Sequence, residues 1–278
     1  MTFRFLGTGT SVGVPQIGCT CRVCTSADPR DRRRRCGVYV TGADGAAFLV
    51  DTPPELRLAC LEYGISKVDA VLLTHAHMDH VAAFDDVRRF NTLNGEKVPC
   101  SPGDALYRGL PYRIVGRPLP CYAMRETVEQ MHQIFPYVGR EGGANGLYRP
   151  MVEFSSADAF SVGGMRVERL AVEHGFPCCG YVVAEAGARF VYASDCHDLP
   201  DETVARARGA DVLAIDCLRE REHPTHLSLS RALDYIARIA PKRAYLVHMC
   251  HDLTHADWLA RLAGTNVEPA YDGLEVEL

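Results

Sequence analysis

One short segment, Thr74–His80, constrains what this chain can fold into more than any other feature. Its residues, Thr-His-Ala-His-Met-Asp-His, directly follow the apolar run Ala70–Leu73, which is typical of a buried strand. Because side chains alternate along an extended backbone, His75 and His77 point the same way. Solvated histidines in a loop are the alternative, but three histidines and one aspartate packed so densely favour a metal site.

Asp79 and His80 follow where the chain turns into the next helix. One turn can therefore offer two imidazoles to one metal ion, and a carboxylate with an imidazole to a second. Imidazole and carboxylate suit zinc, iron or manganese. Two such ions about 3.5–4 Å apart can hold a bridging hydroxide and stabilise both the attacking and the leaving oxygen of a displacement.

The rest of the pattern predicts a mixed α/β protein, without repeats or an obvious linker. Apolar or alternating runs predict strands at Phe3–Leu6, Gly37–Val40, Ala46–Asp51, Ala70–Thr74, Met165–Val172, Gly180–Ala184, Phe190–Ser194, Val212–Ile215 and Ala244–Val247. Helices are expected at Glu55–Tyr63, Asp85–Asn91, Arg125–Phe135, Ser228–Ile239 and Ala256–Leu262, with Ser228 or Ser230 as a cap. Pro99–Pro120 is rich in Pro, Gly and Arg, and is expected to form an extended loop. This distribution suits two packed sheets with helices outside.

Composition narrows the class of protein. The 278 residues carry a net charge of −5, which argues against a general nucleic-acid coat. No apolar run is long enough to cross a membrane, and the N-terminus lacks the layout of a signal peptide. We therefore expect a cytoplasmic protein, in which the 12 cysteines serve as metal ligands or core residues rather than disulfides.

Thr-His-x-His-x-Asp-His resembles the metal-binding motif of the metallo-β-lactamase superfamily, and the resemblance extends along nearly the whole chain. It implies an α/β (α+β) fold, the four-layer αββα sandwich, as a single domain over residues 1–278. It also implies three further ligands after later strands: His174 for the first metal, Asp195 as a bridge and His248 for the second metal. Asp51 either orients a metal histidine, as the resemblance implies, or caps the helix that follows.

Three thiols, Cys19, Cys21 and Cys24, lie in one tight turn. Such a group in a reducing compartment suggests a closed structural zinc site, for which His251 could supply the fourth ligand; three free thiols are the alternative. The arrangement resembles the PhnP branch, the phosphoribosyl cyclic phosphodiesterases, and the opening Gly7–Pro15 is similar to that branch as well. The thiol clip also occurs in PqqB-like proteins. The other cysteines are expected to be small core residues.

His226 resembles an active-site histidine of PhnP-like and RNase Z-like enzymes, which implies a proton donor to the leaving oxygen or a phosphate-holding group. Packing at the start of a helix is the alternative for His226, and it is our expectation for His223. The run Arg32–Arg35 could help to bind phosphate, although such runs are more often solvated.

The resemblance implies a phosphodiesterase with two divalent ions, Zn or Mn, at the active site and one structural Zn. A hydroxide bridging the two ions would attack a small cyclic or diester phosphate, such as a phosphoribosyl cyclic phosphate, with Asp79 and His226 in the catalytic set. We expect no membrane partner and no nucleic-acid partner, and a homodimer stays open. The alternatives are an RNase Z-like nuclease, disfavoured by the charge and by the lack of an obvious RNA-clamping arm; a PqqB-like metal-binding protein of a biosynthetic pathway; and a mononuclear iron dioxygenase, disfavoured by Asp79, His80 and His248.

Overall fold

The computed structural model describes residues 1–104, 109–138 and 149–278. Its body contains two seven-stranded sheets. The first has the order β16-β1-β2-β3-β4-β7-β8, with β1 Thr2–Gly7, β2 Gly37–Thr41, β3 Ala47–Val50, β4 Ala70–Leu72, β7 Leu119–Tyr122, β8 Val152–Ser155 and β16 Glu275–Glu277. The second has the order β15-β14-β13-β12-β11-β10-β9, with β9 Ala159–Val162, β10 Met165–Ala171, β11 Cys179–Glu185, β12 Ala188–Ala193, β13 Val212–Asp216, β14 Arg243–Val247 and β15 Val267–Pro269.

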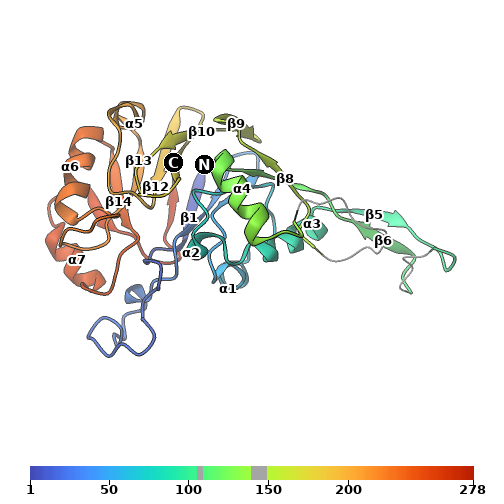
Figure 1. Ribbon diagram of the computed structural model, residues 1–278, viewed down its shortest axis with the longest axis horizontal. Helices are drawn as coiled ribbons and strands as arrows, with labels where there is room; N and C mark the ends of the chain where they lie inside the picture. The colour runs from blue at the N-terminus through green and yellow to red at the C-terminus, as the bar shows by residue number, and fades with distance from the viewer. Residues whose placement is uncertain (105–108, 139–148) are drawn as a thin grey trace.

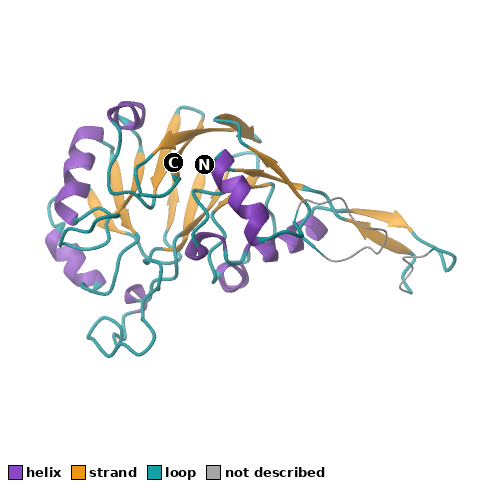
Figure 2. Cartoon of the chain, viewed as in Figure 1, coloured by secondary structure: helices purple, strands orange, loops and turns teal. Residues whose placement is uncertain are grey.

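Helices cover the outer face of each sheet (Figures 1 and 2). Beside the first sheet lie α1 Leu56–Glu62, α2 Met78–Val81, α3 Arg88–Leu93 and α4 Arg125–Ile134. Beside the second lie α5 Asp201–Ala207, α6 Leu229–Ile239 and α7 His255–Arg261. Short 3₁₀ turns occur at Pro29–Asp31 and Phe84–Val87. None of the helices in the described ranges has the length and apolar character needed to cross a membrane.

Three apolar clusters hold these layers together. The inner faces of the two sheets meet in a core that includes Phe3, Phe190 and Tyr192, all almost fully buried. Phe3 and Phe190 stack across it, with ring centroids 3.9 Å apart. A separate cluster lies between each sheet and its own helices. The predicted four-layer αββα sandwich is therefore confirmed; the single-domain boundary stays a prediction.

The stretch between α3 and β7 differs from the expectation. In place of an extended loop, β5 Glu96–Pro99 and β6 Tyr112–Val115 form an antiparallel hairpin, which projects well away from the body (Figure 1). Its prolines, glycines and charged residues hide the period-two pattern by which a strand is recognised. The expected extended loop is therefore wrong where β6 lies, and the hairpin is a projection that the sequence analysis did not predict.

The sheet topology gathers several strand ends at one edge. Strands β12, β13 and β14 run parallel to one another, and β10 has the same direction because it is antiparallel to β11, which is antiparallel to β12. In the first sheet, β3 and β4 are parallel. The residues that follow these strands are polar or ionisable, so the fold concentrates them in one place.

Candidate metal centre

Two groups of side chains with suitable ligand atoms meet at this edge. The first consists of His75, His77 and His174, and the second of Asp79, His80, Asp195 and His248. In each group the candidate ligand atoms lie within 4.8 Å of one another. The structure thus brings together all seven residues that the sequence analysis assigned to two active-site ions.

The first group presents neutral imidazoles. His75 Nε2 lies 3.0 Å from His77 Nδ1, and the ring of His174 is 5.2 Å from that of His75 between centroids. The Nδ1 of His174 lies 2.9 Å from the Thr225 carbonyl oxygen, to which it donates, so its Nε2 keeps a lone pair. Burial lowers the pKa of His75 well below its ordinary value and that of His174 to about 4. Unprotonated imidazoles of this kind are the form that binds a metal.

The second group has the spacing of ligands around a common cation. His80 Nε2 lies 3.2 Å from Asp195 Oδ2, and His248 Nε2 lies 3.1 Å from Asp195 Oδ1. Ligands about 2.0–2.2 Å from a tetrahedral metal are roughly 3.3–3.6 Å apart. Within the described chain, His80 Nε2, His248 Nε2 and Asp195 Oδ2 are buried without a hydrogen-bond partner. Buried polar atoms are rarely left so, and a cation between them would satisfy all three.

The buried carboxylates of this group also favour binding of a cation. Burial by itself would raise the pKa of Asp195, but His248 and His80 hold that pKa well below its usual range. Burial likewise would lower the pKa of His80, and the carboxylates of Asp195 and Asp51 outweigh it and raise the pKa. A metal ion can replace the proton that these carboxylates otherwise draw onto His80. The donor set therefore fits divalent metal ions.

Asp51 connects the two ligand groups through His80 in one group and, by way of Thr74, His75 in the other. Its Oδ2 accepts from His80 Nδ1 at 2.7 Å and from the Thr74 hydroxyl at 2.8 Å, while Thr74 Oγ1 lies 3.0 Å from His75 Nδ1. Asp51 is fully buried and has a positive φ of 64°, a conformation that is uncommon outside glycine. Of the two interpretations left open for Asp51, the structure favours the one in which it orients histidines.

Replacing Asp51 by Asn is expected to weaken metal binding or activity by about 10–100-fold, because the oriented His80 would lose its charged acceptor. Metal titration monitored by calorimetry measures this loss. Asp69→Asn is a matched control, since Asp69 lies away from the candidate ligands and accepts from the backbone of Ala47. Equal metal affinities for Asp51→Asn and wild type would contradict the assigned role.

His226 lies beside both groups, and its partner is a residue that the sequence analysis missed. His226 Nδ1 lies 2.7 Å from Asp216 Oδ2, and its ring stacks on that of His248 with centroids 4.4 Å apart. Burial raises the pKa of Asp216, while backbone N–H groups of Cys196 and Leu227 oppose that rise. With His226 Nδ1 held by Asp216, its Nε2 is the atom left for a substrate. The sequence did carry a signal for Asp216: an apolar strand ends at this acidic residue, just as an apolar strand precedes Asp195.

A cavity of about 460 Å³ opens over these side chains. Its wall includes candidate ligands together with Ser11, Phe176, His223, Thr225 and His226. His223 does bond locally, with its Nδ1 3.3 Å from Thr225 Oγ1, yet it also lines the cavity, which the sequence analysis did not anticipate. Ser11 and Phe176 were missed because a lone serine or phenylalanine carries no local signal of a site.

The cysteine group forms a second, separate cluster. The Sγ atoms of Cys19, Cys21 and Cys24 lie 3.4, 3.6 and 3.3 Å from His251 Nδ1. A tetrahedral zinc with Zn–S near 2.3 Å and Zn–N near 2.0 Å would place sulfur and nitrogen roughly 3.5 Å apart. Backbone hydrogen bonding, chiefly from Cys24, lowers the pKa of Cys21. These four residues fit a closed zinc site, and all 12 cysteines are free of disulfides.

Replacing Cys21 by Ser is expected to remove one zinc and to lower the melting temperature, because a closed site contributes directly to folding. Catalysis should suffer only indirectly. Elemental analysis and thermal unfolding measure the two effects. A matched control is Cys60→Ser, which changes a half-buried thiol outside the cluster. The interpretation fails if Cys21→Ser keeps both its zinc content and its melting temperature.

The arginine run has a structural explanation. Arg33 is buried and donates to the carbonyl oxygens of Cys250 and Leu253, on both sides of His251. Arg34 and Arg35 form ion pairs with Glu62 and Glu55. The run Arg32–Arg35 lines a hollow whose lining shares no residue with that of the cavity over the candidate ligands. The position of Arg32–Arg35 therefore does not support a role for these arginines in binding phosphate at the candidate metal centre.

Two smaller expectations, the cap of α6 and the burial of the remaining cysteines, differ in part from the structure. Ser228 occupies the N-cap position of α6, but its side chain makes no capping hydrogen bond; its hydroxyl donates instead to Glu222 Oε1 at 2.6 Å. Of the nine cysteines predicted to be core residues, all are buried except Cys60, which is half-buried.

The sequence matches the model of a family described as a beta-lactamase superfamily domain over residues 46–249. A curated relative, an octanoyltransferase of Porphyromonas gingivalis, is 31% identical over 273 residues, which is 97% of this chain but 50% of that protein. The chain therefore spans about half the length of that relative.

Two solved structures extend the comparison. A diphosphatase from the PhnP family is 32% identical, with a TM-score of 0.82 over 100% of this chain and 97% of that one. Zn²⁺-bound PqqB from Methylobacterium extorquens shares the fold at 18% identity, with a TM-score of 0.76 over 100% of both chains. The matched family, the four layers and the likeness to the PhnP structure agree, and the chain belongs to the β-lactamase superfamily, as a PhnP-like protein of the metallo-β-lactamase fold.

Proposed function

We propose that the protein is a two-metal phosphoric diester hydrolase that acts on a small cyclic or diester phosphate, similar to a phosphoribosyl cyclic phosphate. The observation that carries the proposal is the pair of ligand groups with His226 and Asp216 beside them, under a cavity of about 460 Å³. That volume suits a small ester better than a polymer. The PhnP-family relative, itself a diphosphatase, supports phosphate chemistry.

The protein's own residues have distinct tasks in this proposal. His75, His77 and His174 would hold a first ion, and Asp79, His80 and His248 a second, with Asp195 within reach of both ligand groups. Two divalent ions there would supply positive charge for the phosphoryl oxygens and a nucleophilic water near neutral pH. His226, held through Nδ1 by Asp216, donates a proton from Nε2 to the leaving oxygen.

Particular features of the molecule bear on the alternative functions. The projecting β5–β6 hairpin removes one argument against an RNase Z-like nuclease, whereas the net charge of −5 still opposes binding of a long polyanion. A complete second ligand group disfavours a mononuclear dioxygenase. A PqqB-like role without hydrolysis is separated from our proposal only by an assay. Similarity to the octanoyltransferase does not support acyl transfer by this chain, because half of that protein lies outside the match.

The test combines metal analysis with a substrate panel. Carefully prepared protein should approach three metals per chain, two at the candidate centre and one at the cysteine cluster. The panel contains a cyclic ribose phosphate, an acyclic phosphodiester, a diphosphate diester and a precursor tRNA. Hydrolysis of the small esters and not of the tRNA supports the proposal. One metal per chain with full activity would rule out the two-metal part, and cleavage of the tRNA alone would favour the nuclease.

A further inference from the structure

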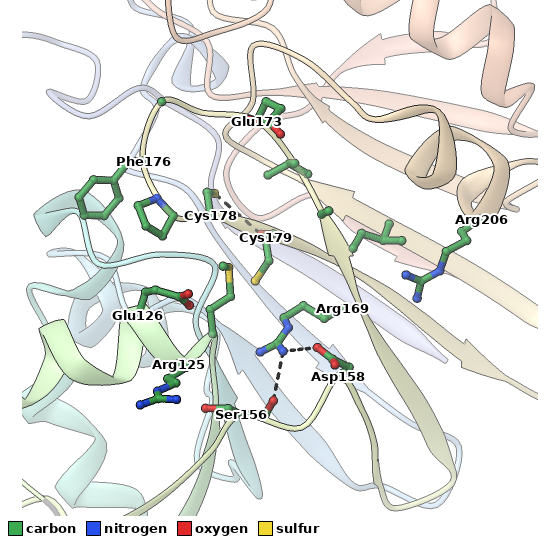
Figure 3. A pocket seen from close by; sticks show the side chains of 16 residues that line it. Arg125, Glu126, Ser156, Asp158, Arg169, Glu173, Phe176, Cys178, Cys179 and Arg206 are labelled. Carbon is green, nitrogen blue, oxygen red and sulfur yellow. Dashed lines mark hydrogen bonds and ion pairs between the residues drawn. The ribbon is translucent and has the colours of Figure 1, made fainter.

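A second hollow adjoins the candidate metal centre. It has a volume of about 810 Å³, and it shares Gly175 and Phe176 with the smaller cavity over the candidate ligands. Its wall comes from the end of β10, the loop that follows β10, the start of α4 and the last turn of α5 (Figure 3). We call this hollow the outer groove. A small cyclic ribose phosphate would fit in the inner cavity alone, so the outer groove offers room for a larger substituent.

Phe176 stands at the junction of the two hollows. Its ring packs against that of His77, with centroids 4.5 Å apart and an angle of 27° between the planes. The residue is only half-buried and lines both hollows, so part of the ring remains open to a ligand. An aromatic ring held in this way is a stacking surface for a planar group.

The rest of the outer groove is apolar at its base and balanced in charge at its rim. Leu170, Val172 and Cys178 are buried there. The charged residues of the rim are three arginines and three acids: Arg125, Arg169, Arg206, Glu126, Asp158 and Glu173.

Arg169, one of the three arginines of the rim, already has hydrogen-bond and ion-pair partners within the protein. Arg169 donates to the Ala123 carbonyl oxygen at 2.8 Å and to the Ser156 carbonyl oxygen at 3.1 Å, and it forms an ion pair with Asp158 (Figure 3). Arg206 likewise pairs with Glu168 at 3.1 Å. A groove of this kind does not attract a polyanion such as RNA. It suits an uncharged planar group that has polar edges.

From this juxtaposition we propose that the outer groove holds the nucleoside of a nucleoside diphosphate ester, with its base on Phe176 and its diphosphate at the candidate metal centre. The inference deepens the proposed function and rests on it. In the reaction, the oxygen of water bonds to one phosphorus and the bridging P–O bond breaks. The bonding pair goes to the departing phosphate oxygen, and the protons of water pass to the product phosphates or solvent. The products are a nucleoside monophosphate and a second phosphate monoester.

The experiment uses Phe176→Leu, which keeps an apolar side chain against His77 but removes the aromatic face, and Phe176→Trp, which keeps a face. Tyr137→Ala is a matched control, an aromatic residue that is 40% exposed and outside both hollows. Substrates are ADP-ribose and P1,P2-dimethyl diphosphate, which has the same anhydride but no base. Elemental analysis of each variant checks that the metal content is unchanged.

For Phe176→Leu, KM for ADP-ribose should rise by roughly 5–100-fold, the range expected for loss of one base-stacking contact. The rise in KM for dimethyl diphosphate should be much smaller, and Phe176→Trp should restore binding of ADP-ribose. Calorimetry provides a readout without turnover: AMP should bind Phe176→Leu more weakly by a similar factor, while the affinity for ribose 5-phosphate should fall much less. Equal effects on ligands with and without a base, or no effect on either, would overturn the inference.

The two proposals fail in different ways. If the wild type hydrolyses none of the phosphate esters but still binds AMP through Phe176, the proposed function fails and nucleoside binding in the outer groove stands. If the wild type hydrolyses dimethyl diphosphate while Phe176→Leu treats ADP-ribose and AMP like wild type, the nucleoside inference fails and the proposed function stands.

Discussion

Replacing His226 by Ala is expected to slow hydrolysis of a diester with a poor leaving group by about 10²–10⁴-fold, while all metals are kept. The Nδ1 of His226 is held 2.7 Å from Asp216 Oδ2, so Nε2 has a fixed direction. The ring also lies beside that of His248, in the wall of the inner cavity. A proton donor matters most when the departing alkoxide is strongly basic.

An aryl diester tests this role, because a phenolate of low pKa departs without a proton. The loss for His226→Ala should then be much smaller, and the ratio of the two losses is the quantity to measure. His223→Ala is the matched control, since His223 lines the same cavity and should lose little on either substrate. Equal losses on both substrates for His226→Ala would contradict proton donation and favour phosphate positioning.

The same role predicts a pH dependence. Burial lowers the pKa of His226 below its ordinary value near 6.5. A proton donor is active below its pKa and is lost as the pH rises through it. For a poor leaving group, kcat/KM, which reports the free enzyme, should therefore have a component that falls with rising pH, with its midpoint below 6.5. That component should vanish in His226→Ala, and its persistence there would assign it to another group.

Replacing Asp79 by Ala should damage hydrolysis of good and poor leaving groups alike, by roughly 10²–10³-fold, since loss of a ligand weakens the second ion and several kcal/mol of charge stabilisation depend on that ion. Asp79 Oδ2 lies 3.3 Å from His80 Nε2 and 3.8 Å from His248 Nε2. Burial by itself would raise the pKa of Asp79, but His248 and His80 beside it outweigh that effect and hold the pKa below its usual range. Its carboxylate is thus available to a metal at any physiological pH.

Metal content separates this variant from His226→Ala. Asp79→Ala should contain about one metal fewer per chain, or should need a higher metal concentration for activity. Asp85→Ala is a suitable control, because Asp85 is partly exposed and forms an ion pair with Arg88 outside the candidate centre. If Asp79→Ala kept its full metal content and lost activity only on the poor leaving group, Asp79 would be a proton carrier rather than a ligand.

The sequence alone predicted candidate ligands wherever those residues lie close together in the chain. His75, His77, Asp79 and His80 lie within six residues after an apolar strand, and Cys19, Cys21 and Cys24 lie in one turn. Proximity in the chain makes proximity in space unavoidable for such groups. Long apolar runs also located most central strands and helices within a few residues, because burial requires those patterns. Metal binding by these residues stays a prediction.

Only the tertiary structure could decide which distant residues meet. His174, Asp195 and His248 join the site because β10, β12 and β14 end at one sheet edge, and no single one of them stands out in the sequence. The resemblance to a family, rather than any local pattern, pointed to them.

The same limit explains what was missed. The pairing of Asp216 with His226 depends on strand order and on burial, which a linear pattern does not encode. For Asp51 the sequence left two roles open, and its buried contact with His80 favours the orienting one. The β5–β6 hairpin escaped prediction because pairing between its two strands, rather than an apolar face, defines it. A cluster of candidate ligands that are close in the chain can be recognised from the sequence. The partners that orient those ligands are determined by backbone hydrogen bonding and packing between remote segments.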